Sequence, residues 1–154
     1  MTITRLNPAE PAAQILLAGL SMHLADLYGY QVDLARSTQA MQQPNVHFLG
    51  VRQDGELVGC GAVKLVEGAE AYGEIKAVFV AEAQRGRGHS RAIMQALEAH
   101  LRSVDIQLAR LATGTRQPEA VALYVSLGYT PCAPFGGQQA DDLTVFMQKP
   151  LGDA

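Results

Sequence analysis

Apolar residues recur along the chain at two different spacings, which separate predicted helices from predicted strands. Leucines at helical spacing predict a first helix over residues 11–28, and a second apolar stripe predicts a helix over 89–103. A proline near the start and a glycine after the end frame a third helix over 118–127. A shorter helix with a polar surface is predicted over 33–42.

Shorter apolar runs between these helices predict strands. Asp54-Gly55 separates two of them and strongly favours a hairpin. The predicted strands cover 2–6, 46–52, 56–66, 72–80, 106–112, 129–132 and 143–149. The order β-α-α-β-β-β-α-β-α-β-β, without repeats or linkers, predicts a single α/β domain over residues 1–154. We expect a mixed central sheet of about seven strands with helices on both faces.

The composition indicates a packed domain and argues against a general nucleic-acid binder. Hydrophobic residues make up 48% of the chain and the net charge is −3, whereas duplex binding requires a basic face. No apolar run is long enough to span a bilayer, and the N-terminus lacks a signal-peptide pattern. Cys60 and Cys132 form neither a disulfide framework nor a four-ligand zinc site. We therefore expect a cytoplasmic protein without a metal, nucleic-acid or membrane partner.

A glycine- and arginine-rich turn follows the predicted strand over 72–80 and leads directly into a helix. Gly86 and Gly88 permit backbone angles that other residues resist and allow a ligand to approach closely. The helix start adds unpaired N–H groups and a partial positive charge. The turn therefore predicts a site for a phosphate-bearing ligand, with a solvated basic rim as the alternative. Its spacing matches neither a P-loop nor a dinucleotide fingerprint. Three arginines supply further charge: Arg85, Arg87 and Arg91.

Two motifs resemble those of the GNAT superfamily of acyl-CoA N-acyltransferases. Arg85–Ser90 resembles motif A, Arg/Gln-x-x-Gly-x-Gly/Ala, with serine in the last position. Gln117–Tyr129 resembles motif B, Asn-x-x-Ala-x-x-Leu-Tyr-x-x-x-Gly-Phe/Tyr, with glutamine in the first position. With the element order, the resemblance covers nearly the whole chain. Further matches are to a bacterial subgroup of mostly undetermined substrate, at Thr113-Gly114, Gln117–Ala120, Pro134–Gly136 and Val145–Lys149.

The resemblance implies acetyl-CoA as co-substrate. The strands over 72–80 and 106–112 are then expected to separate, with the pantetheine arm between them and the pyrophosphate on the backbone amides of the turn. The expected cofactor-binding residues are Val78, Phe79, Val80, Arg85, Gly86, Arg87, Gly88, His89, Ser90, Arg91 and Gln117.

The resemblance also supplies candidates for proton transfer. Tyr124 matches the tyrosine that serves as general acid in many GNAT enzymes, although a packed aromatic is the alternative. Glu74 lies where several members carry a glutamate, and it is the candidate base. Strand alternation leads us to expect Glu74, Lys76, Val78 and Val80 on one face, with an ion pair between Glu74 and Lys76 as the alternative to catalysis.

The acceptor side is less defined by sequence. Tyr28 and Tyr30 fall where the family builds its acceptor pocket, and Phe135 with the loop over 136–142 is expected to close it. Asp141 and Asp142 in that loop suit a cationic acceptor, with a solvated acidic loop as the alternative. Among the histidines, His89 lies in the phosphate turn as a possible donor. Alternative bases are His23 and His47.

The sequence thus predicts an N-acetyltransferase that moves an acetyl group from acetyl-CoA to a primary amine by direct attack in a ternary complex. The alternative is a non-catalytic acyl-CoA-binding regulatory module, which would keep the turn without needing Tyr124 or Glu74. The acceptor, a small molecule or a protein amine, stays open. Because many GNAT domains pair, the resemblance also allows a homodimer.

Overall fold

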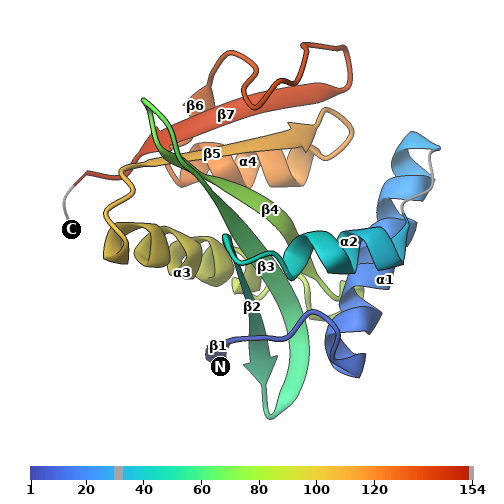
Figure 1. Ribbon diagram of the computed structural model, residues 1–154. Helices are drawn as coiled ribbons and strands as arrows, with labels where there is room; N and C mark the ends of the chain where they lie inside the picture. Colours follow the sequence, from blue (N-terminus) through green and yellow to red (C-terminus); the bar gives the residue numbers. More distant parts are fainter. Residues whose placement is uncertain (30–32, 153–154) are drawn as a thin grey trace.

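Within the described residues, 1–29 and 33–152, the computed structural model contains a mixed seven-stranded sheet (Figure 1). The strand order is β1-β2-β3-β4-β5-β7-β6, and only β4 and β5 are parallel neighbours. The predicted α/β fold with about seven strands is confirmed. The strands are β1 (Thr2–Arg5), β2 (Val46–Gln53), β3 (Glu56–Val66), β4 (Tyr72–Val80), β5 (Leu108–Gly114), β6 (Thr130–Pro131) and β7 (Thr144–Pro150).

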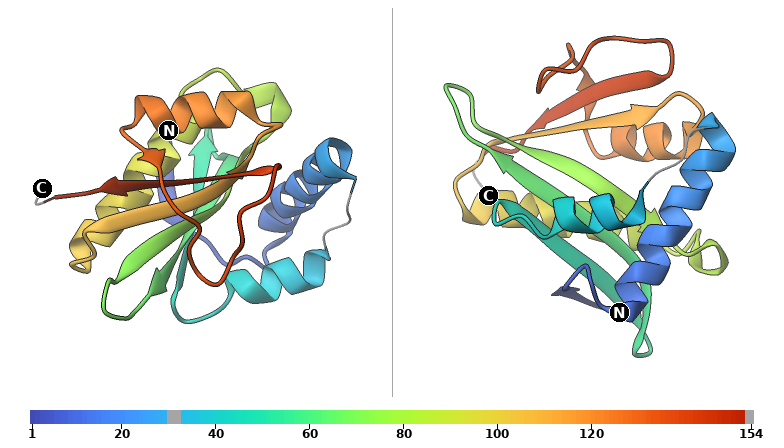
Figure 2. Two further views of the ribbon diagram at one scale, coloured as in Figure 1. Left: turned by 90° about the horizontal axis from the view of Figure 1, so that it is seen from above. Right: turned by 45° about the vertical axis from the view of Figure 1, so that its right-hand side comes forward.

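Two helices cover each face of the sheet, as predicted (Figures 1 and 2). On one face lie α1 (Pro11–Tyr28) and α2 (Leu34–Met41), and on the other lie α3 (His89–Ser103) and α4 (Pro118–Ser126). Proline stands in the first turn of both α1 and α4, where its missing N–H costs no helical hydrogen bond. A short 3-10 turn, Glu82–Gln84, connects β4 to the glycine-rich segment before α3.

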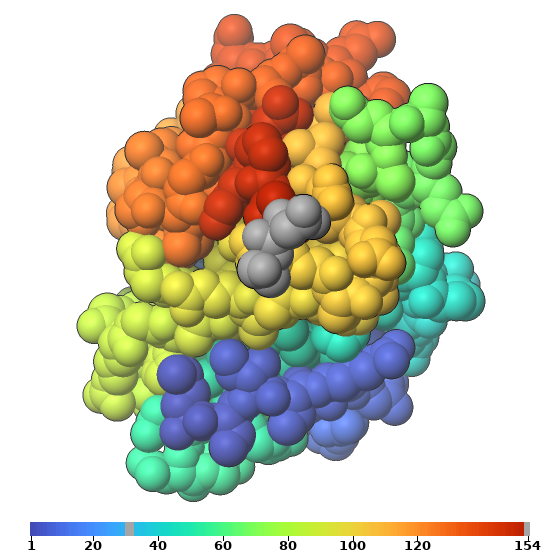
Figure 3. Space-filling model, turned by 90° about the vertical axis from the view of Figure 1, so that its left-hand side faces the viewer, coloured from blue at the N-terminus to red at the C-terminus, as the bar shows by residue number. Residues whose placement is uncertain are grey.

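Helix α3 packs closely on the sheet because small residues face it. Its buried stripe begins at His89 and continues through Ile93, Leu97 and Leu101. A Cβ at Gly61 would overlap the Ile93 side chain, and one at Gly73 would overlap Leu101. The stripe forms the main core, and Figure 3 shows α3 from outside, between the N-terminal and C-terminal segments.

A β-bulge interrupts β4 at Ala77. Cys60 of β3 pairs with Phe79, and Ala62 pairs with Lys76, so Gly61 between them lies opposite two residues of β4. Ala77 adopts a φ of 56°, in the left-handed region that side chains disfavour. The extra residue reverses the alternation of side chains along the strand.

The bulge corrects one sequence expectation. Val78 and Val80 pack with the α3 core, whereas Ala77 and Phe79 pack with the core under α1. Ile75 packs with the α3 core, so Glu74 and Lys76 on either side of it point to the α1 face. The expectation that Glu74, Lys76, Val78 and Val80 share one face is therefore wrong, because simple alternation ends at Ala77.

The parallel pairing of β4 with β5 stops after three residue pairs. Gly73 pairs with Ala109, Glu74 with Arg110, and Ile75 with Leu111. The pairing ends two residues before the bulge. Beyond that point both strands continue, but no further residues of β4 and β5 pair (Figure 1). The expected separation of these strands is confirmed, and it leaves a gap in the sheet.

Several predicted strand ends differ from the observed ones, and two of these differences have consequences for the fold. The strand expected over 106–112 begins at Leu108, because Asp105 adopts a φ of 61° and the Ile106 N–H donates to the Leu101 carbonyl, closing α3. The strand expected over 129–132 is only the two residues of β6.

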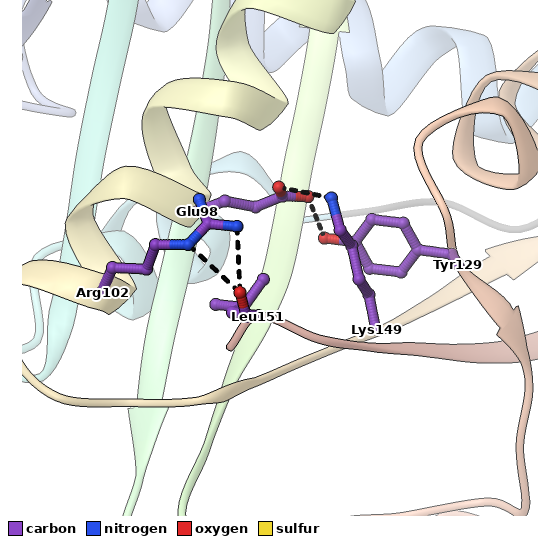
Figure 4. Close-up of polar contacts among 5 residues, drawn as sticks. All are labelled: Glu98, Arg102, Tyr129, Lys149 and Leu151. Carbon is purple, nitrogen blue, oxygen red and sulfur yellow. Dashed lines mark hydrogen bonds and ion pairs between the residues drawn. The ribbon is translucent and has the colours of Figure 1, made fainter. Parts of the chain in front are cut away.

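A buried polar network joins α3 to β7 and to the segment after α4 (Figure 4). The Glu98 side chain is 4% exposed, and its carboxylate accepts hydrogen bonds from the Tyr129 hydroxyl (2.8 Å) and the Lys149 ammonium (2.8 Å). Burial and the adjacent carboxylate raise the pKa of Tyr129. Arg102 on the same helix donates to the Leu151 carbonyl at 3.3 and 3.4 Å. Together these contacts hold the end of α4 against the core.

Replacing Lys149 with methionine tests this network. The substitution leaves the buried Glu98 carboxylate with the Tyr129 hydroxyl alone, so we expect the free energy of unfolding to fall by about 3 kcal/mol. Urea unfolding followed by circular dichroism measures the change. The matched control is Lys64→Met on β3, which has no ion-pair partner among the described residues, and we expect a change within about 0.5 kcal/mol. Equal effects of the two substitutions would contradict the role of the network.

Candidate functional site

Two cavities adjoin where β4 and β5 separate. The strand cavity, about 400 Å³, is bounded by β4, β5, α1, α4 and the loop between β6 and β7. The turn cavity, about 490 Å³, is bounded by the end of β4, the glycine-rich turn, the start of α3, and α4. Four residues line both cavities, so the cavities meet there: Leu20, Val78, Gln117 and Tyr124.

The glycine-rich turn has the backbone geometry that its sequence predicts. Gly86 and Gly88 have φ angles of 78° and 82°, and no atom lies within 4 Å of where a Cβ would stand at either. Gly88 is the N-cap of α3, so the N–H groups of the helix's first turn lack helical partners. Open backbone beside unpaired N–H groups suits an anionic ligand. Several predicted cofactor residues line this cavity: Val78, Phe79, Val80, Arg85, Gly86, Ser90 and Gln117.

The three arginines of the turn occupy different places. Arg85 lines the turn cavity, donates from Nε to the Val80 carbonyl (3.1 Å), and lies 5.4 Å from the centre of the Phe79 ring. Arg87 is exposed and donates to the Gln84 side chain (3.1 Å). Arg91 donates to the Ser126 hydroxyl (2.7 Å) and so joins α3 to α4. Arg87 and Arg91 are outside the lining of both cavities, so Arg85 is the arginine placed to meet a ligand there.

The His89 ring does not line the turn cavity. Its side chain belongs to the buried stripe of α3, with the residue 4% exposed. Within the part of the chain that the structure describes, neither ring nitrogen has a hydrogen-bond partner. The helix start therefore offers the backbone N–H of His89, rather than its ring, to a ligand.

Tyr124 lies at the junction of the two cavities. The residue is 8% exposed, and its ring packs edge-on against Tyr129 with centroids 6.1 Å apart. Burial raises the pKa of Tyr124 to about 12, so its phenol stays protonated at neutral pH. A protonated hydroxyl at the meeting point of two cavities is suited to donate a proton to a group that spans them.

The end of α1 encloses the strand cavity on one side. The Tyr28 hydroxyl accepts from the Arg116 N–H (3.2 Å) and donates to the Gln117 side-chain oxygen (3.4 Å). Gly114 permits this approach, because a Cβ there would overlap the Tyr28 hydroxyl. Tyr28 therefore lines the cavity as expected, whereas Tyr30 lies outside the described residues.

The β6–β7 loop forms the opposite wall. Phe135 anchors it, packing edge-on against Tyr72 (5.5 Å between centroids) and Phe146 (5.6 Å). The Arg110 guanidinium lies 4.7 Å from the Tyr72 ring centre and pairs with Glu70. Loop residues then reach the strand cavity: Gln138, Asp141 and Leu143.

Two charged side chains line the strand cavity. Lys76 extends from β4, and the described residues give it no hydrogen bond or ion pair. Asp141 accepts from the Leu143 N–H (2.8 Å), and this bond, with others from Thr144, lowers the pKa of Asp141. The sequence indicates Lys76 only as an ion-pair partner for Glu74. Strand alternation predicts neither the bulge nor the cavity beside Lys76.

The candidate bases are dispersed. Glu74 is half-buried on β4, opposite Arg110, and lines neither cavity. His23 lines the turn cavity, 6.3 Å from the Phe79 ring centre. His47 stacks on His100 with centroids 3.7 Å apart and lines neither cavity.

The described residues contain neither a metal-binding cluster nor a membrane-spanning helix. Across 1–29 and 33–152, no group of three or more histidine, cysteine or acidic side chains is arranged to hold a metal ion. In the same ranges, the helices all fall short of the length and apolar character needed to cross a bilayer.

Comparison with known proteins identifies relatives along nearly the whole chain. The model of the acetyltransferase (GNAT) family matches residues 19–129. An IAA acetyltransferase of Azospirillum brasilense is 35% identical over 152 residues, which cover 98% of each chain. The protein YsnE of Bacillus subtilis, an uncharacterised N-acetyltransferase, is 28% identical over 119 residues, covering 76% of this chain and 78% of its own.

Solved structures share the fold. A Klebsiella pneumoniae protein assigned as an acyl-CoA N-acyltransferase is 36% identical, covers 97% of each chain and superposes with a TM-score of 0.80. The Salmonella typhimurium protein yncA, solved with acetyl-CoA, is 21% identical, with a TM-score of 0.75 over 99% of this chain and 95% of its own. The family model, the Azospirillum relative that matches along 98% of this chain, and the shared fold agree. The protein therefore belongs to the acetyltransferase (GNAT) family.

Proposed function

We propose that this acetyltransferase moves an acetyl group from acetyl-CoA to a primary amine by direct attack in a ternary complex. The observation that carries the proposal is the meeting of two cavities at Tyr124. One cavity ends at a turn that suits an anion, and the other is bounded by α1 and the β6–β7 loop. A donor in the first and an acceptor in the second would bring their reacting groups together beside the phenol.

The turn cavity suits the pyrophosphate and the pantetheine arm of acetyl-CoA. The pyrophosphate would accept from the N–H groups of residues 85–90, and Arg85 adds a cation beside them. The Ala81 N–H donates to the Val58 carbonyl (2.9 Å), so the neighbouring Val80 backbone groups point away from β3 toward the gap. The pantetheine amides can pair with those groups once Arg85 releases the Val80 carbonyl. The arm then takes the place of the strand that β5 vacates.

The proposed reaction begins with loss of a proton from the acceptor ammonium. Glu74 takes that proton. It acts through a water molecule, because its carboxylate lies on the α1 face of β4 but does not line the cavity. The neutral nitrogen attacks the thioester carbonyl, and a backbone N–H near Phe79 on the unpaired edge of β4 stabilises the oxyanion. The C–N bond forms, the C–S bond breaks, and the Tyr124 hydroxyl donates its proton to the departing thiolate. The acylated nitrogen then loses its extra proton, which restores the Tyr124 phenol.

Two alternatives to this function predict different results when CoA release is measured. A regulatory module would bind acetyl-CoA in the turn cavity without releasing CoA for any acceptor. The Azospirillum relative is named for IAA, so IAA belongs in the acceptor panel beside the amines. CoA release with IAA alone would contradict the proposed amine acceptor while leaving acetyl transfer intact.

Tyr124→Phe tests the proton donor. We expect kcat for CoA release to fall about 100-fold because the thiolate loses its acid, while the Kd for acetyl-CoA stays unchanged because the ring remains in place. Thiol release across an amine panel measures the first quantity, and calorimetry the second. Tyr72→Phe, in the aromatic cluster under the β6–β7 loop, is the matched control. Full activity in Tyr124→Phe would mean that the ring serves packing alone.

Glu74→Gln tests the proposed base. The amide keeps the size of the side chain but cannot take a proton, so we expect kcat to fall at least about tenfold with no change in KM for acetyl-CoA. Steady-state kinetics with the best amine of the panel provides both constants. Glu70→Gln, which alters the ion pair with Arg110, is the control that should keep its kcat. Wild-type kcat in Glu74→Gln would exclude the carboxylate as base.

A further inference from the structure

We propose that the strand cavity selects a small acceptor that carries a carboxylate in addition to its amine, as an amino acid does. The inference rests on the proposed function, because it assigns the acceptor to the strand cavity. It names a substrate class through two charged side chains, Lys76 and Asp141, and through the size of the cavity.

Lys76 is the first part of the argument. It is half-buried on β4 and is the single cation in the cavity lining, counted over the described residues. Among the described residues, neither Glu74 on the same strand nor Asp141 in the same cavity lining forms an ion pair with it. By contrast, the partly buried Lys149 has Glu98 as its partner. An ammonium without a counter-ion in a partly enclosed cavity attracts an anion and repels a simple alkylammonium.

Asp141 is the second part. It stands on the β6–β7 loop, a different wall from that of Lys76, where the residue is exposed. It accepts a hydrogen bond from the Leu143 N–H (2.8 Å), and this bond, with others from Thr144, lowers the pKa of Asp141. The loop therefore offers a carboxylate to an acceptor ammonium at the cavity wall. One positive and one negative side chain on separate walls match a zwitterion better than they match either a cation or an anion alone.

The rest of the lining limits the size of the acceptor. Leucines of α1 and of the loop and aliphatic residues of both strands line the cavity, together with polar side chains such as Thr113, Gln117 and Gln138. A cavity of about 400 Å³ accommodates a small molecule, and the Tyr28 contacts close one side of it. The predicted class is thus a free amino acid, with its carboxylate on Lys76 and its amine toward Tyr124.

Matched acceptor pairs test the proposal. Phenylalanine, leucine and methionine are each compared with their amides, which keep the amine and the side chain but lack the carboxylate, by CoA release at fixed pH. Because a hydrogen-bonded ion pair contributes about 1.5–3 kcal/mol, we expect kcat/KM to favour the carboxylates by at least about tenfold. Mass spectrometry of the product identifies the N-acetyl amino acid.

Variants then assign the preference to one side chain. Lys76→Met should remove most of the preference by raising KM for the amino acids, and Lys76→Glu should reverse it. Lys64→Met, on the neighbouring strand and outside both cavities, should keep it.

Three outcomes would overturn the inference: equal kcat/KM within the pairs, a preference that survives Lys76→Met, or turnover with a protein amine but with no amino acid. Each of these still shows acetyl transfer from acetyl-CoA, so the proposed function can stand while the substrate class fails. CoA binding without release for any acceptor would instead count against the proposed function itself.

Discussion

The structure depends on the early end of pairing between β4 and β5. Three residue pairs join the strands, and the bulge at Ala77 follows two residues later in β4. Continuous pairing would bring the strands within hydrogen-bonding distance and leave no gap, because paired strands lie only about 4.8 Å apart. The separation instead produces an unpaired strand edge and two adjoining cavities. Tyr124 acquires its position at their junction from this one departure from regular sheet geometry.

The separated strands require support from outside the sheet. Glu98, Tyr129 and Lys149 fix the end of α4 to α3 and β7, and Arg91 joins α3 to α4 through Ser126. A buried carboxylate without hydrogen-bond partners is costly, so the contacts with Tyr129 and Lys149 stabilise Glu98 in its buried position. Packing and polar contacts therefore hold α4 in position, whereas strand pairing does not.

The sequence predicts most of the fold because its elements follow ordinary periodicity. The helix over 11–28, the strand over 72–80 and the helix over 89–103 match the structure at both ends. The bulge cannot be predicted because an alanine at position 77 gives no indication of a positive φ. Without the bulge, the sequence also does not show that Lys76 points to a different face from Val78 and Val80. His89 misleads for a related reason: it lies inside a recognisable motif, yet helical periodicity assigns its ring to the core. Motifs locate backbone geometry more reliably than they locate side chains.

A crystal structure with bound acetyl-CoA tests the central claim most directly. The account predicts the pyrophosphate on the backbone amides of residues 85–90 and the pantetheine arm in the gap between β4 and β5. It also predicts the thioester sulfur within hydrogen-bonding reach of the Tyr124 hydroxyl. Acetyl-CoA bound outside that gap, or with its sulfur directed away from Tyr124, would contradict the account.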